Sequence, residues 1–189
     1  MTYTALLDAN VLYPAVTRDI LMRLAVTDIY KARWSNNIHR EWIENLLENE
    51  PKREHAKLER TRELMDLNVR DALVTGYEPL IPGIVGLPDP GDRHVLAAAI
   101  VGRCDVIVTA NLRDFPEGAI APYGIEAIHP DEFVGSHLSL APGVFCGCVK
   151  RIRAQLKNPP MSVEDYLGKL VACGLVATAQ ALEQYAELI

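Results

Sequence analysis

The chain has 189 residues, 49% of them hydrophobic, which suits one domain, or one domain with an appendage, around a sizeable core. Its net charge of -6 disfavours a general polyanion-binding protein, but it leaves room for a nuclease whose metal site concentrates carboxylates. We expect a cytoplasmic protein with reduced, buried thiols, because no apolar run could span a bilayer, the N-terminus lacks a basic signal region, and the four cysteines form no CxxC pair.

The first predicted element is an apolar strand over residues 3–8 that ends in an acid, Asp8. A helix is predicted to begin at Pro14 and to reach about Thr27. Taken alone, Asp8 has two explanations. It is either a turn residue that bonds its own backbone or a site residue at the carboxyl end of a strand.

A short strand over residues 32–35 and a helix from Asn37 to about Asn49 follow, with Ser35 or Asn36 as the cap. Glu41 lies at the edge of the helix's apolar face, and Glu44 is its rival on a more polar arc. For any single acid on this helix, a solvated surface is the simpler explanation.

Pro51 is predicted to open a strongly charged helix that reaches about Asn68, with a thin apolar stripe that includes Leu58 and Met65. Its basic residues could contact phosphate, but we favour a solvent-exposed helix with mixed-sign pairs four residues apart. Residues 71–88 are predicted to be irregular, with a short strand near residues 80–81. Long loops of this kind often have a functional use.

The segment from Asp89 to Pro116 carries most of the functional signal. Asp89 caps a helix that has Pro90 at its first position and Asp92 near its third, and the helix ends at Gly102. Residues 105–109 are β-branched and apolar, which is typical of a buried parallel strand. Asn111 and Asp114 follow that strand.

The C-terminal third is predicted to begin with a strand at residues 125–128 and a short helix at residues 130–134. We place a domain boundary near Gly135, which gives a domain over 1–135 and a helical extension over 136–189. The extension has a helix from Pro142 to Leu156, a break at residues 159–160, and a helix from Val163 to the end, with Ser162 as its cap. The first helix carries a basic cluster that is equally compatible with nucleic-acid binding and with a solvent-exposed helix face. Its members are Lys150, Arg151, Arg153 and Lys157.

The acids fall at comparable places in an α/β fold. Asp8 ends one strand, Asp114 follows another, and Asp92 begins a helix, so all three are expected at the carboxyl edge of a parallel sheet, where Glu41 could join them. Clustered carboxylates repel each other unless a cation compensates, and Mg²⁺ or Mn²⁺ prefers such oxygen ligands. A metal of this kind activates water and neutralises charge on a phosphodiester, so phosphodiester hydrolysis uses the cluster best.

Other chemistries have less support in the sequence. An aspartyl-phosphate enzyme would want a second acid at position 10, where the chain has Asn10. The five histidines are scattered and form no HExxH motif, and there is no nucleotide-cradling GxGxxG or GxxxxGK[ST] loop. The absence of GxSxG argues against an α/β-hydrolase nucleophile.

Four segments together resemble the PIN-domain family, and within it the VapC-type toxins of bacterial toxin–antitoxin modules. They are residues 6–12 (LLDANVL), 37–41 (NIHRE), 92–99 (DRHVLAAA) and 108–115 (VTANLRDF). The likeness spans about residues 3 to 134. It implies a three-layer α/β/α fold with a parallel sheet, a Mg²⁺ or Mn²⁺ cofactor, endoribonuclease activity on RNA, an antitoxin partner that inserts near the acids, and commonly a homodimer.

The resemblance also implies roles for individual residues. Asp8 and Asp92 would be the principal metal ligands. Glu41 and Asp114 would complete the acidic cluster, hold a second metal or orient the attacking water. Many relatives have Asp at position 111, so the fourth ligand is either Asn111 or Asp114. The residues expected to position water, phosphate or the RNA backbone are Asn10, Thr109, Asn111, Arg93 and Arg113.

Two alternatives remain open at the level of sequence. One is a non-catalytic PIN-fold module that holds RNA or a protein, which Asn111 and the negative net charge favour. The other is a housekeeping RNA-processing nuclease, which shares the chemistry and differs only in regulation. The sequence names neither the RNA target nor the antitoxin.

Overall fold

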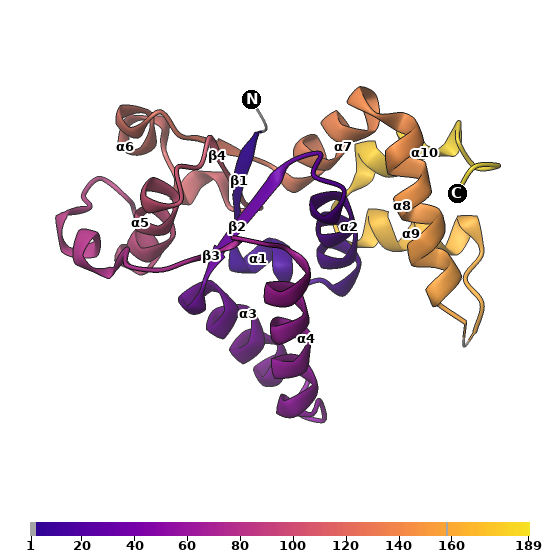
Figure 1. The fold of residues 1–189 in the computed structure, drawn as a ribbon, viewed down its shortest axis with the longest axis horizontal. Coiled ribbons are helices and arrows are strands. Elements are labelled where there is room, and N and C mark those ends of the chain that lie inside the picture. Colours follow the sequence, from indigo (N-terminus) through magenta and orange to yellow (C-terminus); the bar gives the residue numbers. More distant parts are fainter. Residues whose placement is uncertain (1–2, 158) are drawn as a thin grey trace.

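The computed structural model describes residues 3–157 and 159–189 and is built around a parallel sheet of five strands (Figure 1). The strands lie in the order β3-β2-β1-β4-β5, so β1 is central and pairs with β2 on one side and β4 on the other. The predicted α/β class with a parallel sheet is therefore confirmed. The strands are β1 (Thr4–Leu7), β2 (Lys31–Ser35), β3 (Leu73–Val74), β4 (Val106–Val108) and β5 (Glu126–Ile128).

The central strands are short apolar runs because helices cover both faces of the sheet. Every residue of β1 and β4 is buried. The chain first builds outward from β1 to β2 and β3, and then returns to place β4 on the other side of β1. The junction between β1 and β4 is thus the point where the strand order reverses, which is where open α/β sheets bind ligands.

Helices of the first 120 residues form the outer layers (Figure 1). Helix α5 packs against β1, β2 and β4 on one side of the sheet, and α2 packs against β2 on the other. Three consecutive alanines of α5, at positions 97–99, are fully buried, which lets the helix approach the strands closely. The helices of this part are α1 (Ala9–Leu12), α2 (Ala15–Val26), α3 (Asn36–Asn49), α4 (His55–Asn68), α5 (Arg93–Val101) and α6 (Glu117–Ile120).

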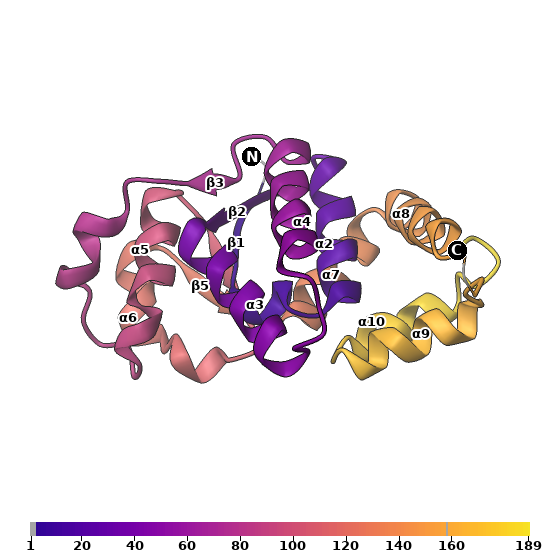
Figure 2. The same ribbon diagram turned by 90° about the horizontal axis from the view of Figure 1, so that it is seen from below.

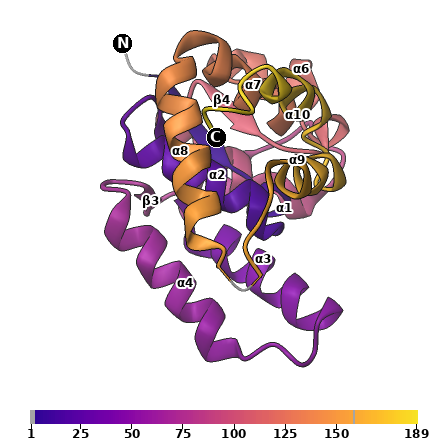
Figure 3. The ribbon, with the colours of Figure 1, turned by 90° about the vertical axis from the view of Figure 1, so that its right-hand side faces the viewer.

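The C-terminal part is helical, as predicted, and consists of α7 (Pro130–Leu140), α8 (Pro142–Gln155), α9 (Val163–Ala172) and α10 (Val176–Glu183). Helix α8 packs against α2, α9 and α10 run side by side, and α10 also packs on α7 (Figures 2 and 3). Asp131 fastens this arrangement, because its carboxylate accepts bonds from the backbone N–H groups of Ala177 (2.7 Å) and Thr178 (2.8 Å) at the start of α10. Helix α7 runs through Gly135, so the domain boundary near that residue stays a prediction.

Several local predictions were wrong. The strand expected at residues 80–81 is instead part of a 3-10 helix, Glu78–Gly83, and the strand of this region is β3. Pro79 and Pro82 explain the error, since a residue without an N–H cannot donate to a strand ladder. The charged helix begins at His55 rather than Pro51 because residues 51–54 form a turn and a short connection.

Three further helix boundaries differ from expectation. The short helix α1 directly after Asp8 was not predicted. The helix that begins at Pro130 extends to Leu140 instead of ending near position 134. The final predicted helix is two helices, separated at Gly174, whose φ of +82° is the left-handed conformation that commonly ends a helix.

The interpretation of α4 as a solvent-exposed helix is confirmed. Its basic side chains pair with acids and form no free basic stripe, but the spacing is mostly three residues and not the expected four, as in Lys57–Glu54 (2.8 Å) and Arg60–Glu63 (2.9 Å). Among the described residues, three of the four cysteines are buried and all are free thiols. Within residues 3–157 and 159–189, no helix has the length and hydropathy needed to cross a membrane.

Candidate functional site

Asp8 lies at the strand-order reversal, immediately after β1 and at the start of α1. Its side chain is buried, with the residue only 6% exposed. Oδ1 accepts a bond from the backbone N–H of Ala9 at 2.7 Å, which caps α1. Oδ2 accepts bonds from the Asn10 amide (2.6 Å) and the Thr109 hydroxyl (2.8 Å). The carboxylate is therefore held in one orientation from three directions.

The polar groups of Asn10 and Thr109 have protein partners. Asn10 Oδ1 accepts a bond from the backbone N–H of Ala110 (3.0 Å), and Thr109 Oγ1 accepts one from the backbone N–H of Asn111 (3.0 Å). The two side chains thus tie Asp8 to the loop after β4. This arrangement orients Asp8, and the role of Asn10 and Thr109 in positioning water or phosphate stays a prediction.

The charges of the other three predicted acids all act on Asp92. Burial, followed by the charges of Asp8, Asp114, Asp89 and Glu41, raises the pKa of Asp92 to about 6. Burial also raises the pKa of Asp8; the bonds from Thr109 and Ala9 oppose this shift, and the charge of Glu41 adds to it. The sequence separates these acids by up to 106 positions, and the fold gathers them at one edge of the sheet.

Glu41 has a partner that the sequence did not reveal. His94 of α5 contacts it, with 2.6 Å between His94 Nε2 and Glu41 Oε1. The rival acid Glu44 instead lies beside Arg40 at 4.0 Å, and both of those side chains are about 60% exposed. The structure therefore turns Glu41, not Glu44, toward the other acids. A signal for His94 existed in the sequence, because it is a polar residue on the otherwise apolar buried face of α5.

The remaining predicted residues lie around the acids. Asn111 and Arg113 are exposed on the loop after β4, while Arg93 is half-buried at the start of α5. A hollow of about 410 Å³ lies beside that loop and is lined by residues 110–114, so Asp114 borders it.

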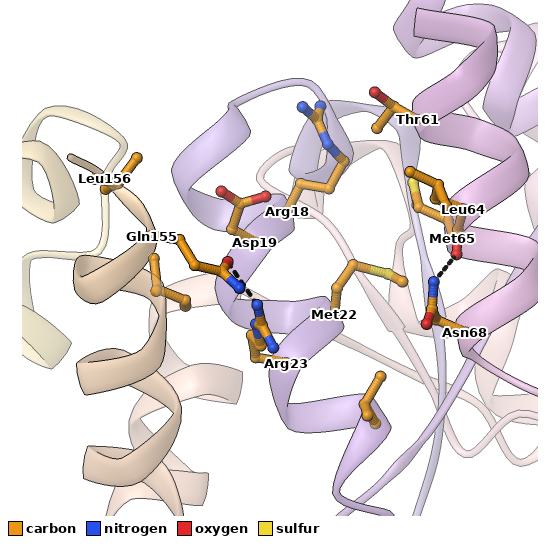
Figure 4. A pocket seen from close by; sticks show the side chains of 12 residues that line it. Arg18, Asp19, Met22, Arg23, Thr61, Leu64, Met65, Asn68, Gln155 and Leu156 are labelled. Carbon is orange, nitrogen blue, oxygen red and sulfur yellow. Dashed lines mark hydrogen bonds between the residues drawn. The ribbon is translucent and has the colours of Figure 1, made fainter. Parts of the chain in front are cut away.

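A second hollow of about 380 Å³ lies between α2, α4 and α8 (Figure 4). Met22, Leu64 and Met65 contribute apolar side chains to its lining. The Arg23 guanidinium donates a 2.6 Å hydrogen bond to the side-chain oxygen of Gln155, which also lines it. None of the four acids lines it. The hollow is consequently separate from the acidic edge.

The donor chemistry of the acidic edge fits a hard divalent cation. Among residues 3–157 and 159–189, no three His, Cys, Asp or Glu side chains stand close enough to enclose an ion. Mg²⁺ does not need such a cage, because it usually keeps several waters and takes one or two carboxylates together with substrate phosphates. Burial is the main cause of the raised pKa of Asp92, and the charges of neighbouring carboxylates add to it; a cation would relieve that repulsion.

Comparisons with known proteins match both parts of the chain. A PIN domain family model matches residues 4–113, and a VapC50 C-terminal domain model matches residues 130–184. A curated protein of Mycobacterium tuberculosis (strain ATCC 25618 / H37Rv), named "Putative ribonuclease VapC50", is 45% identical over 106 residues, which are 53% of this chain. The match covers 60% of that relative's length. No solved structure matches. Because the PIN domain model spans more than half of the chain, the protein belongs to the PIN-domain family.

Proposed function

We propose that this protein is a metal-dependent endoribonuclease that hydrolyses RNA phosphodiester bonds, and that it is the toxin of a type II toxin–antitoxin module. The observation that carries the proposal is the group of four acids at the strand-order reversal, with the pKa of Asp92 raised to about 6 by burial and by its neighbours' charges. The name of the 45% identical relative, a ribonuclease of VapC type, supports the same reaction.

In this proposal the four acids have different roles. Asp8 and Asp92 would hold the metal and Asp114 would lie beside it, while the bonds from Asn10 and Thr109 keep the Asp8 carboxylate in one orientation. Bound Mg²⁺ or Mn²⁺ would lower the pKa of a coordinated water and neutralise charge on the phosphodiester. Glu41 would accept a proton from the attacking water as its oxygen bonds to phosphorus, and the ribose oxygen that leaves phosphorus would take a proton from solvent.

The basic and amide side chains near the acids would contact the RNA. Arg113 and Asn111 line the hollow beside the acids, and Arg93 begins α5, so all three can meet a backbone phosphate there. Asn111 is neutral and Asp114 is charged. We place Asp114, rather than Asn111, beside the metal that Asp8 and Asp92 would hold, because the charge of Asp114 already acts on Asp92. The proposed partners are the RNA substrate, a cognate antitoxin and a second copy of the chain.

The test is cleavage of a structured RNA panel with Mn²⁺ by the native chain, Asp8→Asn and Asp92→Asn, each with and without EDTA. Each substitution should lower the cleavage rate by more than about 10- to 100-fold, which is the usual effect of removing a residue that only orients a metal ligand. Glu41→Gln joins these variants to test the third acid, and Glu44→Gln is its matched control, because Glu44 lies on the same helix but is exposed. Thermal unfolding must show that all variants fold. A variant of Asp8 or Asp92 that cuts at the native rate would refute the assignment.

The second candidate is a non-catalytic PIN-fold module that holds RNA or a protein. The lack of three enclosing metal ligands among the described residues favours it. A Mn²⁺ titration discriminates, because ligand bound only to the folded state stabilises by about 2.7 kcal/mol at a hundred times its Kd. Feeble stabilisation together with tight RNA binding and no cleavage would favour the module.

A further inference from the structure

We propose that His94 is a positioning residue that holds the Glu41 carboxylate against the acidic edge. The inference deepens the proposed function and rests on it for the link to cleavage. It begins from the 2.6 Å contact between His94 Nε2 and Glu41 Oε1, which joins helices whose residues are 53 positions apart.

His94 is a rigid anchor for this bond. The residue is 8% exposed and sits on α5, which packs against three strands of the sheet. A carboxylate only accepts hydrogen bonds, so the ring donates from Nε2. Nδ1 is buried and has no hydrogen-bond partner among the described residues. The ring is therefore held by packing on one side and by Glu41 on the other.

Glu41 needs such an anchor. Its side chain is 36% exposed, and its charge raises the pKa of both Asp8 and Asp92, which means that the three carboxylates repel one another. A free glutamate in this place would turn toward solvent, where it gains rotamer freedom and leaves the repulsion. The bond from His94 offsets both tendencies and keeps the carboxylate pre-oriented for the reaction.

His39 offers a comparison, because it is a second buried histidine that contacts a carboxylate. His39, on the same helix as Glu41, is also buried and also bonds a carboxylate, with 3.2 Å between its Nε2 and Asp66 Oδ1. Asp66 belongs to α4 and also accepts a 2.7 Å bond from the Trp34 indole. That network joins α3 to α4 and does not involve the acidic edge, so His39 is a matched control.

Four variants test the proposal by cleavage kinetics. His94→Leu removes the donor and should lower kcat about 10- to 100-fold with little change in KM, since outer-shell partners have effects of this size and the RNA contacts remain. In His94→Gln the side-chain amide nitrogen can reach the place of Nε2, so kcat should return to within about tenfold of the native value. His39→Leu and His39→Gln should change stability but leave the kcat of the folded protein unchanged.

A second readout does not depend on cleavage. Mn²⁺ affinity is measured by electron paramagnetic resonance for the native chain, His94→Leu, Glu41→Gln and the double variant. Glu41→Gln removes a negative charge that acts on Asp8 and Asp92, so it should weaken Mn²⁺ binding. If His94 acts through Glu41, His94→Leu weakens binding as well, and the double variant weakens it no further than Glu41→Gln alone. The ring ¹⁵N resonances of His94 should also report a proton on Nε2 and should shift in Glu41→Gln but not in Glu44→Gln.

The outcomes separate the two proposals. Additive effects on Mn²⁺ affinity, or native cleavage by His94→Leu, would overturn the role of His94 and leave the proposed function in place. No cleavage of any RNA by the native chain, together with non-additive Mn²⁺ binding, would overturn the nuclease and leave the His94–Glu41 relationship in place.

Discussion

The hydroxyl of Thr109 donates a 2.8 Å hydrogen bond to Oδ2 of Asp8, across 101 residues of sequence, and so joins the ends of β4 and β1. Both residues are buried. Burial raises the pKa of Asp8, and this bond opposes the shift because it favours the ionised carboxylate. Thr109 therefore holds both the position and the charge of the first acid.

Thr109→Val should impair both stability and cleavage. The substitution keeps the side chain's shape but leaves a buried carboxylate oxygen without one partner, which costs about 1–3 kcal/mol of unfolding free energy. Cleavage should fall about 10- to 100-fold, as for other partners that orient a metal ligand. Thr109→Ser keeps the hydroxyl and should retain most activity.

The matched control for this prediction is Thr178→Val. Thr178 is also fully buried, and its hydroxyl donates to the backbone carbonyl of Asp131 at 3.1 Å, far from the acids in the C-terminal helices. Denaturant unfolding and RNA cleavage are measured on both variants. Native activity in Thr109→Val, or equal loss of activity in Thr178→Val, would contradict the role of Thr109.

Stability should fall in mild acid because of His137. The residue is 4% exposed, packs against the rings of Tyr30 and Phe133, and donates from Nδ1 to the carbonyl of Phe133 at 2.7 Å. Burial lowers its pKa, and the bond to Phe133 opposes that shift without cancelling it. A histidine whose pKa is lowered in the folded state binds a proton more readily in the unfolded state. Its contribution to the free energy of unfolding is therefore complete above the unfolded pKa of about 6.5 and is lost as the pH falls from there toward the folded pKa.

The measurement is the free energy of unfolding from pH 8 to pH 5. His137 alone should contribute a slope of up to about 1.4 kcal/mol per pH unit below pH 6.5. His137→Asn keeps a donor near Nδ1 but cannot titrate, so its overall stability drops while the slope becomes shallower. His55→Asn, at an exposed site, is the control for the slope. An unchanged slope in His137→Asn would exclude this residue as the source.

The acidic edge was predictable because its signals are local. A short apolar run that ends in Asp8, and a capped helix start that contains Asp92, each determine their own place at the carboxyl edge of a parallel sheet. The order of the strands then brings them together. The two-residue strand β3 was not predictable, since it has no periodicity and exists through its pairing with β2.

The details of the site depend on packing between distant segments. The pairing of Glu41 with His94 requires α3 and α5 to meet, which no local pattern indicates. Likewise, Asn10 and Thr109 were expected near the acids, but the sequence could not show that their polar atoms are taken up by Asp8 and by the loop after β4. Residue type predicted the chemistry, and tertiary contacts decided the partners.

Removal of the Asp131 carboxylate should loosen α10 from α7. Asp131 accepts bonds from two backbone N–H groups at the start of α10, and loss of a capping side chain costs about 0.5–2 kcal/mol. Asp131→Ala should therefore speed amide hydrogen exchange and proteolysis within α10. Glu132→Ala, the exposed neighbour, is the control. Equal protection of α10 in both variants would show that Asp131 does not secure it.

The two bonds that the Asp131 carboxylate accepts from the start of α10 should be lost in strong acid. Burial acts to raise the pKa of Asp131, but the bonds from Thr178 and Ala177 outweigh it, and the net pKa lies below the ordinary value. The contribution is therefore complete above the unfolded pKa of about 3.9 and is lost as the pH falls through the folded value. Exchange within α10 should accelerate in that range for the native chain and not for Asp131→Ala.

Two glycines should respond in opposite directions to substitution by alanine. At Gly102, after α5, an added Cβ would lie 2.9 Å from the carbonyl oxygen of Ala98 and 3.0 Å from Val74 Cγ2, so backbone or core must shift. Overpacking of this kind costs about 1–3 kcal/mol. At Gly147, inside α8, nothing lies within 4 Å of the added atom, and alanine is favoured over glycine in a helix by about 0.5–1 kcal/mol. Denaturant midpoints should therefore fall for Gly102→Ala and rise for Gly147→Ala, and two shifts of the same sign would contradict the packing described around one of these positions.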